Sequence, residues 1–116
     1  MLDALAGELE RYMDLLSFRQ KLVASNIANA DTPGYRTRDI DFQAEYRNAL
    51  AQMGAEQDPQ VVSASGLPGK NDGNNVSLDR ESRLLAENDL RFQVASSLLR
   101  STIRQVQSAI NEDKSG

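Results

Sequence analysis

Two segments of the chain carry apolar residues at helical spacing, and a polar stretch separates them. The first segment runs from residue 2 to residue 30 and contains no proline. Its apolar residues recur every seven positions: Leu2, Leu9, Leu16, Val23 and Ala30. Such a repeat is typical of a helix that packs along one side against another helix. The sequence therefore predicts an N-terminal helix about 43 Å long, at about 1.5 Å per residue.

The second segment, from Leu78 to Asn111, has the same periodicity without interruption. Its seven-residue repeat consists of Leu78, Leu85, Phe92, Leu99 and Val106. Ser77 or Asp79 can cap its first turn by accepting a hydrogen bond from a backbone amide. We therefore predict a C-terminal helix about 50 Å long.

Between the two segments, the chain begins with a predicted turn. Pro33 cannot continue a helix, because it has no amide hydrogen, and it restricts Thr32 to extended geometry. Gly34 can adopt the positive φ that a type II turn requires after proline. The first helix is therefore expected to end near residue 30.

The rest of the middle region predicts short elements. Residues 36–42 are expected to be extended, with Ile40 and Phe42 on one side. A short helix is expected next, with one apolar face formed by Phe42, Tyr46, Ala49, Leu50 and Met53. Residues 54–75 predict a loop with a short strand at residues 60–63.

The predicted fold class is mainly α. Two long terminal helices, in residues 1–30 and 77–116, form a coiled-coil-like pair, and residues 31–76 form a small irregular insert that contains β structure. Two helices alone cannot easily cover both apolar stripes, and apolar helix faces are normally hidden by other helices. This favours self-association or a helical partner, although the insert of a monomeric small bundle could also cover the stripes.

The composition of the chain excludes most kinds of catalytic and metal site. The chain contains no Cys and no His. Disulfides, thiol catalysis and Cys-based zinc sites are therefore excluded, and the commonest general base and metal ligand at neutral pH is missing. We expect no enzymatic activity, no cofactor and no metal site.

Charge and hydropathy also limit the partners. The chain has 13 basic and 17 acidic residues, a net charge of −4, and no basic stripe. Nucleic acid is therefore not an expected partner. The first residues lack the basic region of a secretory signal peptide, and no apolar run approaches about 20 residues, so no membrane span is expected.

One pair of carboxylates merits comparison with a catalytic site. Asp39 and Asp41 flank Ile40, and in an extended segment their side chains would point to the same face about 7 Å apart. Paired carboxylates can hydrolyse glycosides. The more ordinary interpretation, which we favour, is a solvated strand face with Ile40 and Phe42 turned inward.

Two candidate loop motifs do not have the residue spacing that calcium-binding or phosphate-binding loops require. When Gly73 is aligned with the invariant glycine of an EF-hand, Pro68 and Lys70 fall at ligand positions, so a calcium loop is not predicted. The nearby glycines lack the following Lys-Ser or Lys-Thr of a phosphate-binding loop. We therefore interpret residues 71–75 as a turn that leads into the last helix.

Two blocks of sequence resemble a known family. The string Asn26-Ile27-Ala28-Asn29, followed by Thr32-Pro33-Gly34-Tyr35, resembles the N-terminal motif of the bacterial flagellar rod and hook proteins. Residues 72–81, residues 85–88 and the tail from residue 91 to 110 are similar to the branch of that family at the base of the rod.

The resemblance implies a structural subunit of the flagellar basal-body rod. Such a subunit joins the MS ring and export gate to the distal rod and transmits torque. It reaches the periplasm through the flagellar type III export apparatus without a cleaved signal peptide. The implied partners are copies of itself, other rod proteins and the proteins at the junction of MS ring and export gate, with no nucleic acid and no small-molecule substrate.

The resemblance and the periodicity together assign roles to two sets of residues. One set fixes the junction where the chain leaves the helical core: Asn26, Ile27, Asn29, Asp31, Thr32, Pro33, Gly34 and Tyr35. The other set provides helix pairing and subunit contacts: Leu9, Leu16, Val23, Ile40, Phe42, Leu85, Phe92, Leu99 and Val106. The alternative function is a soluble helical adaptor or export chaperone that masks a partner helix.

Overall fold

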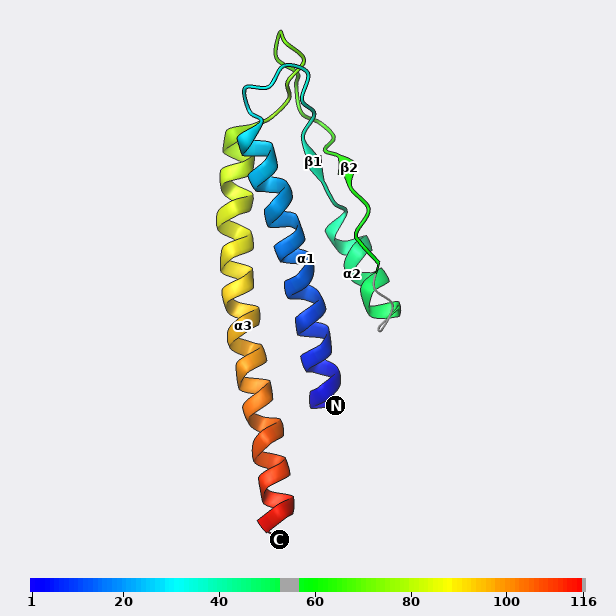
Figure 1. Ribbon diagram of the computed structural model, residues 1–116, viewed down its shortest axis with the longest axis vertical. Coiled ribbons are helices and arrows are strands. Elements are labelled where there is room, and N and C mark those ends of the chain that lie inside the picture. The colour runs from blue at the N-terminus through cyan, green and yellow to red at the C-terminus, as the bar shows by residue number, and fades with distance from the viewer. Residues whose placement is uncertain (53–56, 116) are drawn as a thin grey trace.

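The computed structural model describes residues 1–52 and 57–115. Its elements follow in the order α1 (Leu2–Ala28), β1 (Arg38–Asp39), α2 (Phe42–Ala51), β2 (Val62–Ser63) and α3 (Leu78–Ser115). Figure 1 shows an elongated molecule in which α1 lies between α3 on one side and the insert on the other. Its extents are 71 × 25 × 18 Å. The predicted fold class, with two long terminal helices and a small insert containing β structure, is confirmed.

Both long helices end slightly away from their predicted ends. α1 stops at Ala28 because the Asn29 side chain donates a 2.9 Å hydrogen bond back to the Ser25 carbonyl and closes the last turn. α3 continues to Ser115, past the predicted end, since no proline or glycine interrupts it before the final residue. At its start, Ser77 Oγ accepts a 3.2 Å hydrogen bond from the Arg80 amide, which confirms one of the two predicted caps.

The insert consists of a short antiparallel ribbon, formed by β1 and β2, and the helix α2. Both β1 and α2 contact α1. Arg38 pairs with Ser63, and Asp39 pairs with Val62. The extended segment is shorter than predicted because α2 begins at Phe42. Of the predicted apolar face of α2, Met53 lies outside the described residues.

The apolar core lies between α1 and the insert. Leu15 and Leu22 of α1 are buried against Ile40, and this cluster is extended by partly buried residues: Phe18, Phe42, Tyr46, Ala49 and Val61. Tyr12 meets the rings of Phe42 and Tyr46 edge-on, each at 5.5 Å between centroids. One side of α1 is therefore covered within the chain.

Another side of α1 faces α3. Leu16 and Val23 are only 1% and 2% exposed, and each follows a core residue by one position, about 100° further around the helix. Since α3 is the remaining element in the described chain that contacts α1, these two side chains pack against it.

The side of α3 that faces α1 is polar or small. Its buried positions are seven residues apart: Glu81, Asn88, Ala95 and Thr102, with exposed fractions of 0, 2, 3 and 5%. We call these four residues the polar seam. The predicted apolar repeat lies beside it and is largely exposed in its first half, at 53% for Leu78, 41% for Leu85 and 36% for Phe92. Leu99 and Val106 are half-buried.

Truncating Leu16 is expected to destabilise the helix pair strongly. Leu16→Ala removes a fully buried side chain and leaves a cavity, so the free energy of unfolding should fall by about 2–5 kcal/mol. Leu85→Ala, on an exposed position of α3, should change it by less than about 0.5 kcal/mol. Urea unfolding followed by circular dichroism measures both, and equal losses would contradict the assignment of the two faces.

Candidate functional site

The residues of the family motif lie where α1 ends, and three stretches of chain meet there. These are the last turns of α1, residues 34–40, and residues 72–81 at the entry to α3 (Figure 1). Hydrogen bonds and ion pairs connect the three stretches. We call it the junction.

Asn26 is the centre of the junction. Its Nδ2 donates to the Arg38 carbonyl at 2.9 Å and to Glu81 Oε1 at 2.6 Å. Its Oδ1 accepts from the Arg38 amide at 3.0 Å and from the Tyr35 hydroxyl at 2.9 Å. The buried amide therefore uses its full capacity of two donors and two lone pairs, and it holds α1, β1 and α3 together.

Asn29 and Thr32 organise the chain just after α1. Thr32 Oγ1 donates to Asn29 Oδ1 at 3.1 Å, and the Thr32 amide donates to the Asn29 carbonyl. The helix-end carbonyls of Ser25 and Ile27, which would otherwise lack partners, accept from Asn29 and from the Ala30 amide. Three other members of the predicted junction set are exposed on the tip: Asp31, Pro33 and Gly34. Ile27 is exposed in the last turn of α1.

Two asparagines before α3 complete the junction, although the sequence indicated only a turn there. Asn74 Nδ2 donates to the Asn29 carbonyl at 2.9 Å and to the Thr32 carbonyl at 2.8 Å. Asn75 Oδ1 accepts from the Thr37 amide at 2.6 Å. Their burial was not predictable from loop composition, but they lie in the second block of family resemblance, which was a usable signal.

Two glycines allow the turn after α1 and the turn before α3 to approach each other closely at the tip of the junction. Gly34 has φ of +74°, as the predicted turn requires, and Gly73 has φ of +85°. The Gly34 amide donates to the Asp72 carbonyl at 2.9 Å, and a Cβ added to Gly73 would lie 3.5 Å from Gly34 Cα. Positive φ is unfavourable for residues that carry a Cβ, so both positions favour glycine.

A charged network adjoins Asn26. Arg19 binds Asp39 through two hydrogen bonds, of 2.9 and 3.0 Å, and Arg80 Nη2 binds the same carboxylate. Arg80 Nη1 also binds Glu81, at 3.0 and 3.1 Å from its two oxygens. The network therefore connects α1, β1 and α3 through side chains that are largely withdrawn from water.

The interpretation of Asp39 as part of a solvated strand face is wrong. Its residue is 7% exposed, and both carboxylate oxygens are held by arginines. Asp41 is exposed and instead caps α2, where its Oδ1 accepts from the Ala44 amide at 3.2 Å. The two carboxylates therefore do not face a common space, because the strand ends at Asp39 and Asp41 starts a helix.

The two buried carboxyl groups have opposite pKa shifts. Burial by itself raises the pKa of Asp39, but the hydrogen bonds and charge of Arg19, the Ile40 amide and Arg80 outweigh it and leave that pKa below its ordinary value. Burial raises the pKa of Glu81, and the hydrogen bond from Asn26 and the charge of Arg80 offset only part of this. Asp39 and Glu81 should therefore respond differently to acid.

The coupling between protonation and folding determines whether each carboxyl group stabilises the protein more at high or at low pH. A lowered folded pKa at Asp39 contributes stability that is full above the unfolded pKa and is lost as the pH falls through the folded pKa. A raised folded pKa at Glu81 contributes stability that is full below the unfolded pKa and is lost as the pH rises through the folded pKa.

Glu81→Gln therefore provides a pH test. The free energy of unfolding of the wild type, minus that of Glu81→Gln, is expected to increase as the pH falls from about 7 to about 4. The same difference for Asp39→Asn should decrease over the acid range. Urea unfolding at a series of pH values measures both differences, and slopes of the same sign would contradict the assignment.

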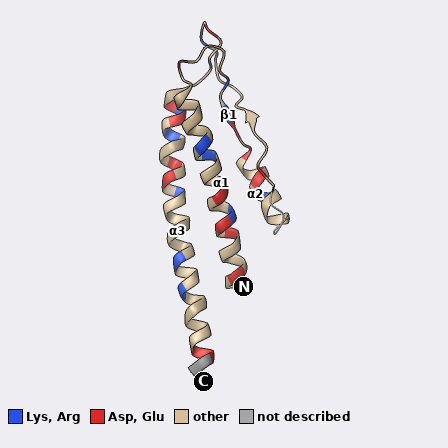
Figure 2. Cartoon of the chain, in the orientation of Figure 1, with Lys and Arg blue, Asp and Glu red and all other residues tan. Residues whose placement is uncertain are grey.

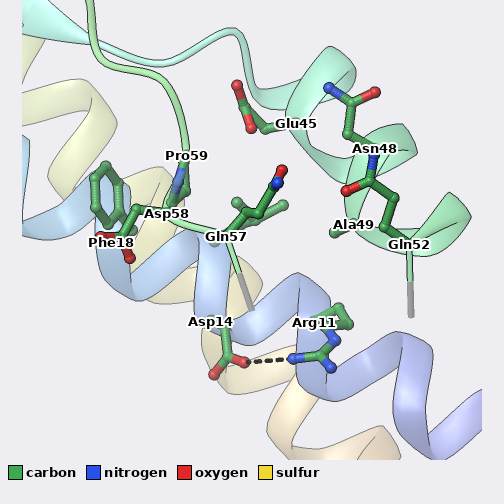
Figure 3. Close-up of a pocket in the computed structure, with 11 residues that line it drawn as sticks. Arg11, Asp14, Phe18, Glu45, Asn48, Ala49, Gln52, Gln57, Asp58 and Pro59 are labelled. Atoms are coloured by element: carbon green, nitrogen blue, oxygen red, sulfur yellow. Dashed lines mark ion pairs between the residues drawn. The ribbon is translucent and has the colours of Figure 1, made fainter. Parts of the chain in front are cut away.

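A separate cleft lies between α1 and the insert (Figure 3). It encloses about 600 Å³, with Leu15, Phe18 and Ala49 among its apolar lining residues. Arg11 and Asp14 form a 3.9 Å ion pair at its edge. Within residues 1–52 and 57–115, no group of three acidic side chains is placed to hold a metal ion.

Figure 2 shows basic and acidic residues interspersed along both long helices. In the described part of the chain, no helix combines the length and apolar character needed to cross a membrane.

Comparison with known proteins gives the class of protein. A family model described as flagella basal body rod protein matches residues 13–36. The flagellar basal body rod protein FlgB of Yersinia ruckeri is 31% identical, over 97% of this chain and 99% of the relative. FlgB of Escherichia coli K12 is 34% identical, over 90% of this chain and 93% of the relative.

The chain therefore belongs to the family of flagellar basal body rod proteins. Relatives that match over nearly their whole length include several FlgB proteins, among them FlgB of Salmonella typhimurium at 33% identity over 90% of this chain and 93% of the relative. The family is structural, so this chain is a rod subunit of the flagellar basal body and not an enzyme. Membership also implies association with other basal-body components.

The residues predicted for subunit contacts divide by burial. Leu16, Val23 and Ile40 are covered by the chain itself and serve its internal packing. Leu85 and Phe92 are exposed. The remaining members are half-buried: Leu9, Phe42, Leu99 and Val106. Contact of the exposed and half-buried members with other subunits stays a prediction.

Proposed function

We propose that the chain assembles through its terminal helices into the proximal, periplasmic part of the rod. There it joins the MS ring and export gate to the distal rod and transmits torque. The observation that carries this proposal is the apolar surface of α3. Its exposed residues form two groups on different sides of the helix, at about 100° per residue. One group is Leu78, Leu85, Phe92, Ile103 and Ile110, and the other is Leu90, Val94 and Leu98. A surface of this length is stabilised when neighbouring helices cover it.

The junction suits a part that transmits torque. Arg19, Asp39 and Arg80 connect both long helices to the ribbon. Asn26 joins the same three elements through its hydrogen bonds. The insert is therefore tied to the helical core at several points, so a force on one is passed to the other without a free hinge in the junction.

The proposed partners follow from the family. Copies of the chain and other rod proteins cover α3, and proteins at the junction of MS ring and export gate bind the lower end of the rod. Delivery uses the flagellar type III export apparatus, without a cleaved signal peptide. Two different patches on one subunit can generate an open helical array.

The experiment is deletion of the gene in its own organism, with imaging of the remaining basal bodies. Loss of motility and absence of rods above the MS ring, both restored by the wild-type chain, are expected. Normal rods and swimming would contradict the proposal. A stable complex with one soluble client, in place of rods, would instead favour the adaptor or export chaperone.

A charge on the exposed stripe should separate assembly from folding. Phe92→Asp is expected to keep the helix content of the isolated chain, since the side chain is partly exposed, but to abolish motility because a neighbouring helix would have to bury the charge. Gln93→Asp, on the next exposed position of α3, is the matched control and should swim normally. Complementation on motility agar measures both, and motility of the Phe92→Asp strain would exclude this stripe as an assembly surface.

A further inference from the structure

We infer that Glu81 and Asn88 are positioning residues that set the rotation of α3 about its own axis and thereby keep its apolar repeat turned away from α1. The repeat follows the polar seam closely around the helix. Leu85 is four residues after Glu81, which places it about 40° further around. A small turn of α3 would therefore exchange the polar seam for the apolar repeat on the side that faces α1.

Apolar burial alone would favour that exchange. The opposing side of α1 offers Leu16 and Val23, both buried against α3. Seam residues of α3 are polar or small, while larger apolar side chains beside the first half of the seam remain exposed to water. Because burial of apolar area is the main favourable contribution to packing, something specific must oppose the turn.

The opposing contacts come from the first two seam residues. Glu81 Oε1 accepts from Asn26 Nδ2 of α1 at 2.6 Å. Asn88 Nδ2 donates to Gln20 Oε1 at 3.1 Å, and Gln20 Nε2 donates to the Leu85 carbonyl at 3.4 Å. Turning α3 would break these bonds and take the buried Glu81 and Asn88 side chains away from their partners on α1.

The contact with α1 satisfies only part of the hydrogen-bonding capacity of the Asn88 side chain. Asn88 Oδ1 is buried and has no hydrogen-bond partner among the described residues. A buried polar atom without a partner is unfavourable, and replacing it by an apolar group would remove that penalty. In paired helices, a single buried asparagine in the apolar seam is a known means of fixing one register at a cost in stability.

The exposure of the repeat changes along α3 as this inference requires. It is greatest beside Glu81 and Asn88, at Leu78 and Leu85. Where the seam continues with Ala95 and Thr102, which make no side-chain hydrogen bond to α1, Leu99 and Val106 are half-buried. The repeat is therefore turned outward most where the polar contacts with α1 occur.

Thiol labelling can measure the rotation, because the chain contains no native cysteine. Leu85→Cys places one reactive thiol on the repeat. Val94→Cys places another on the opposite flank, about 100° before Ala95. Each reporter is made in the wild-type chain and in the Glu81→Ala/Asn88→Ala chain. Rates are measured with a small thiol reagent, and size-exclusion chromatography checks that the chain is monomeric.

In the double-alanine chain, the thiol at position 85 is expected to react at least about tenfold more slowly than the same thiol in the chain that keeps Glu81 and Asn88. The thiol at position 94 should change by less than about twofold. Asn88→Ala alone, which keeps the Glu81 contacts, should give a smaller slowing at position 85. This milder variant keeps the test decisive if the double variant unfolds.

Other outcomes would overturn the inference. An unchanged or faster rate at position 85 would show that the two residues serve only general stability. Slowing at both positions would indicate association between copies and not rotation. The labelling result does not depend on the proposed function. Only the identity of the partner that covers the outward-facing apolar repeat rests on the proposed function. Failure of the rod proposal would leave the labelling result unchanged.

Discussion

Replacing Asp39 by asparagine is expected to lower the free energy of unfolding by about 3 kcal/mol at neutral pH. The change leaves Arg19 and Arg80 near each other without the carboxylate that binds both. Breaking a largely buried ion pair from one side typically costs about 3–5 kcal/mol, and the partial exposure of both arginines places the estimate at the lower end. Urea unfolding followed by circular dichroism measures the loss.

Asp41→Asn is the matched control, because it makes the same chemical change two residues away. Asp41 is exposed, and asparagine accepts the capping hydrogen bond of α2 about as well as aspartate. Its free energy of unfolding should stay within about 0.5 kcal/mol of the wild type. Similar losses in the two variants would show that the charged network contributes little to stability.

Asn26→Asp should cause a second large loss, also about 3 kcal/mol, although the two side chains have nearly the same shape. The substitution replaces Nδ2, which donates to the Arg38 carbonyl and to Glu81, by an oxygen that can donate to neither. Two acceptors then lose a hydrogen bond from this side chain, at about 1–3 kcal/mol each, and a second carboxylate is placed beside Glu81.

Asn71→Asp tests the same change at an exposed position of the tip. It should be nearly neutral in the same urea experiment. Tyr35→Phe gives a further comparison, because it removes one of the four hydrogen bonds of Asn26 and should cost about 1 kcal/mol. An Asn26→Asp chain as stable as the wild type would mean that the junction tolerates disorder around this side chain.

The sequence predicted the helices well because their determinants are local. Seven-residue spacing identified both long segments, and Pro33 with Gly34 marked the exit from α1. The Ser77 cap was also predictable, since it depends only on the residues of the first turn of α3. The ends of α1 and α3 were less accurate, because the Asn29 side chain closes α1 early and nothing interrupts α3 after residue 111.

The polar seam was not predictable from periodicity. Apolar patterns place a helix face toward the core, but they do not reveal polar side chains whose partners lie far away in the chain. Asn26 and Glu81 are 55 residues apart, and Asn88 and Gln20 are 68 residues apart. Asp39 was misinterpreted for the same reason, because its burial depends on Arg19 and Arg80, which alternation along a strand cannot indicate.

The hydrogen bonds of Asn26 also close one edge of the ribbon. Both backbone groups of Arg38 that point away from β2 are bonded to the Asn26 amide, which occupies the place of a third strand. An unpaired strand edge is a template on which another chain can add. In this protein a helix side chain blocks that edge at Arg38, so growth of the ribbon by strand addition is restricted to β2. One route to amyloid-like aggregation is thereby blocked at this strand edge.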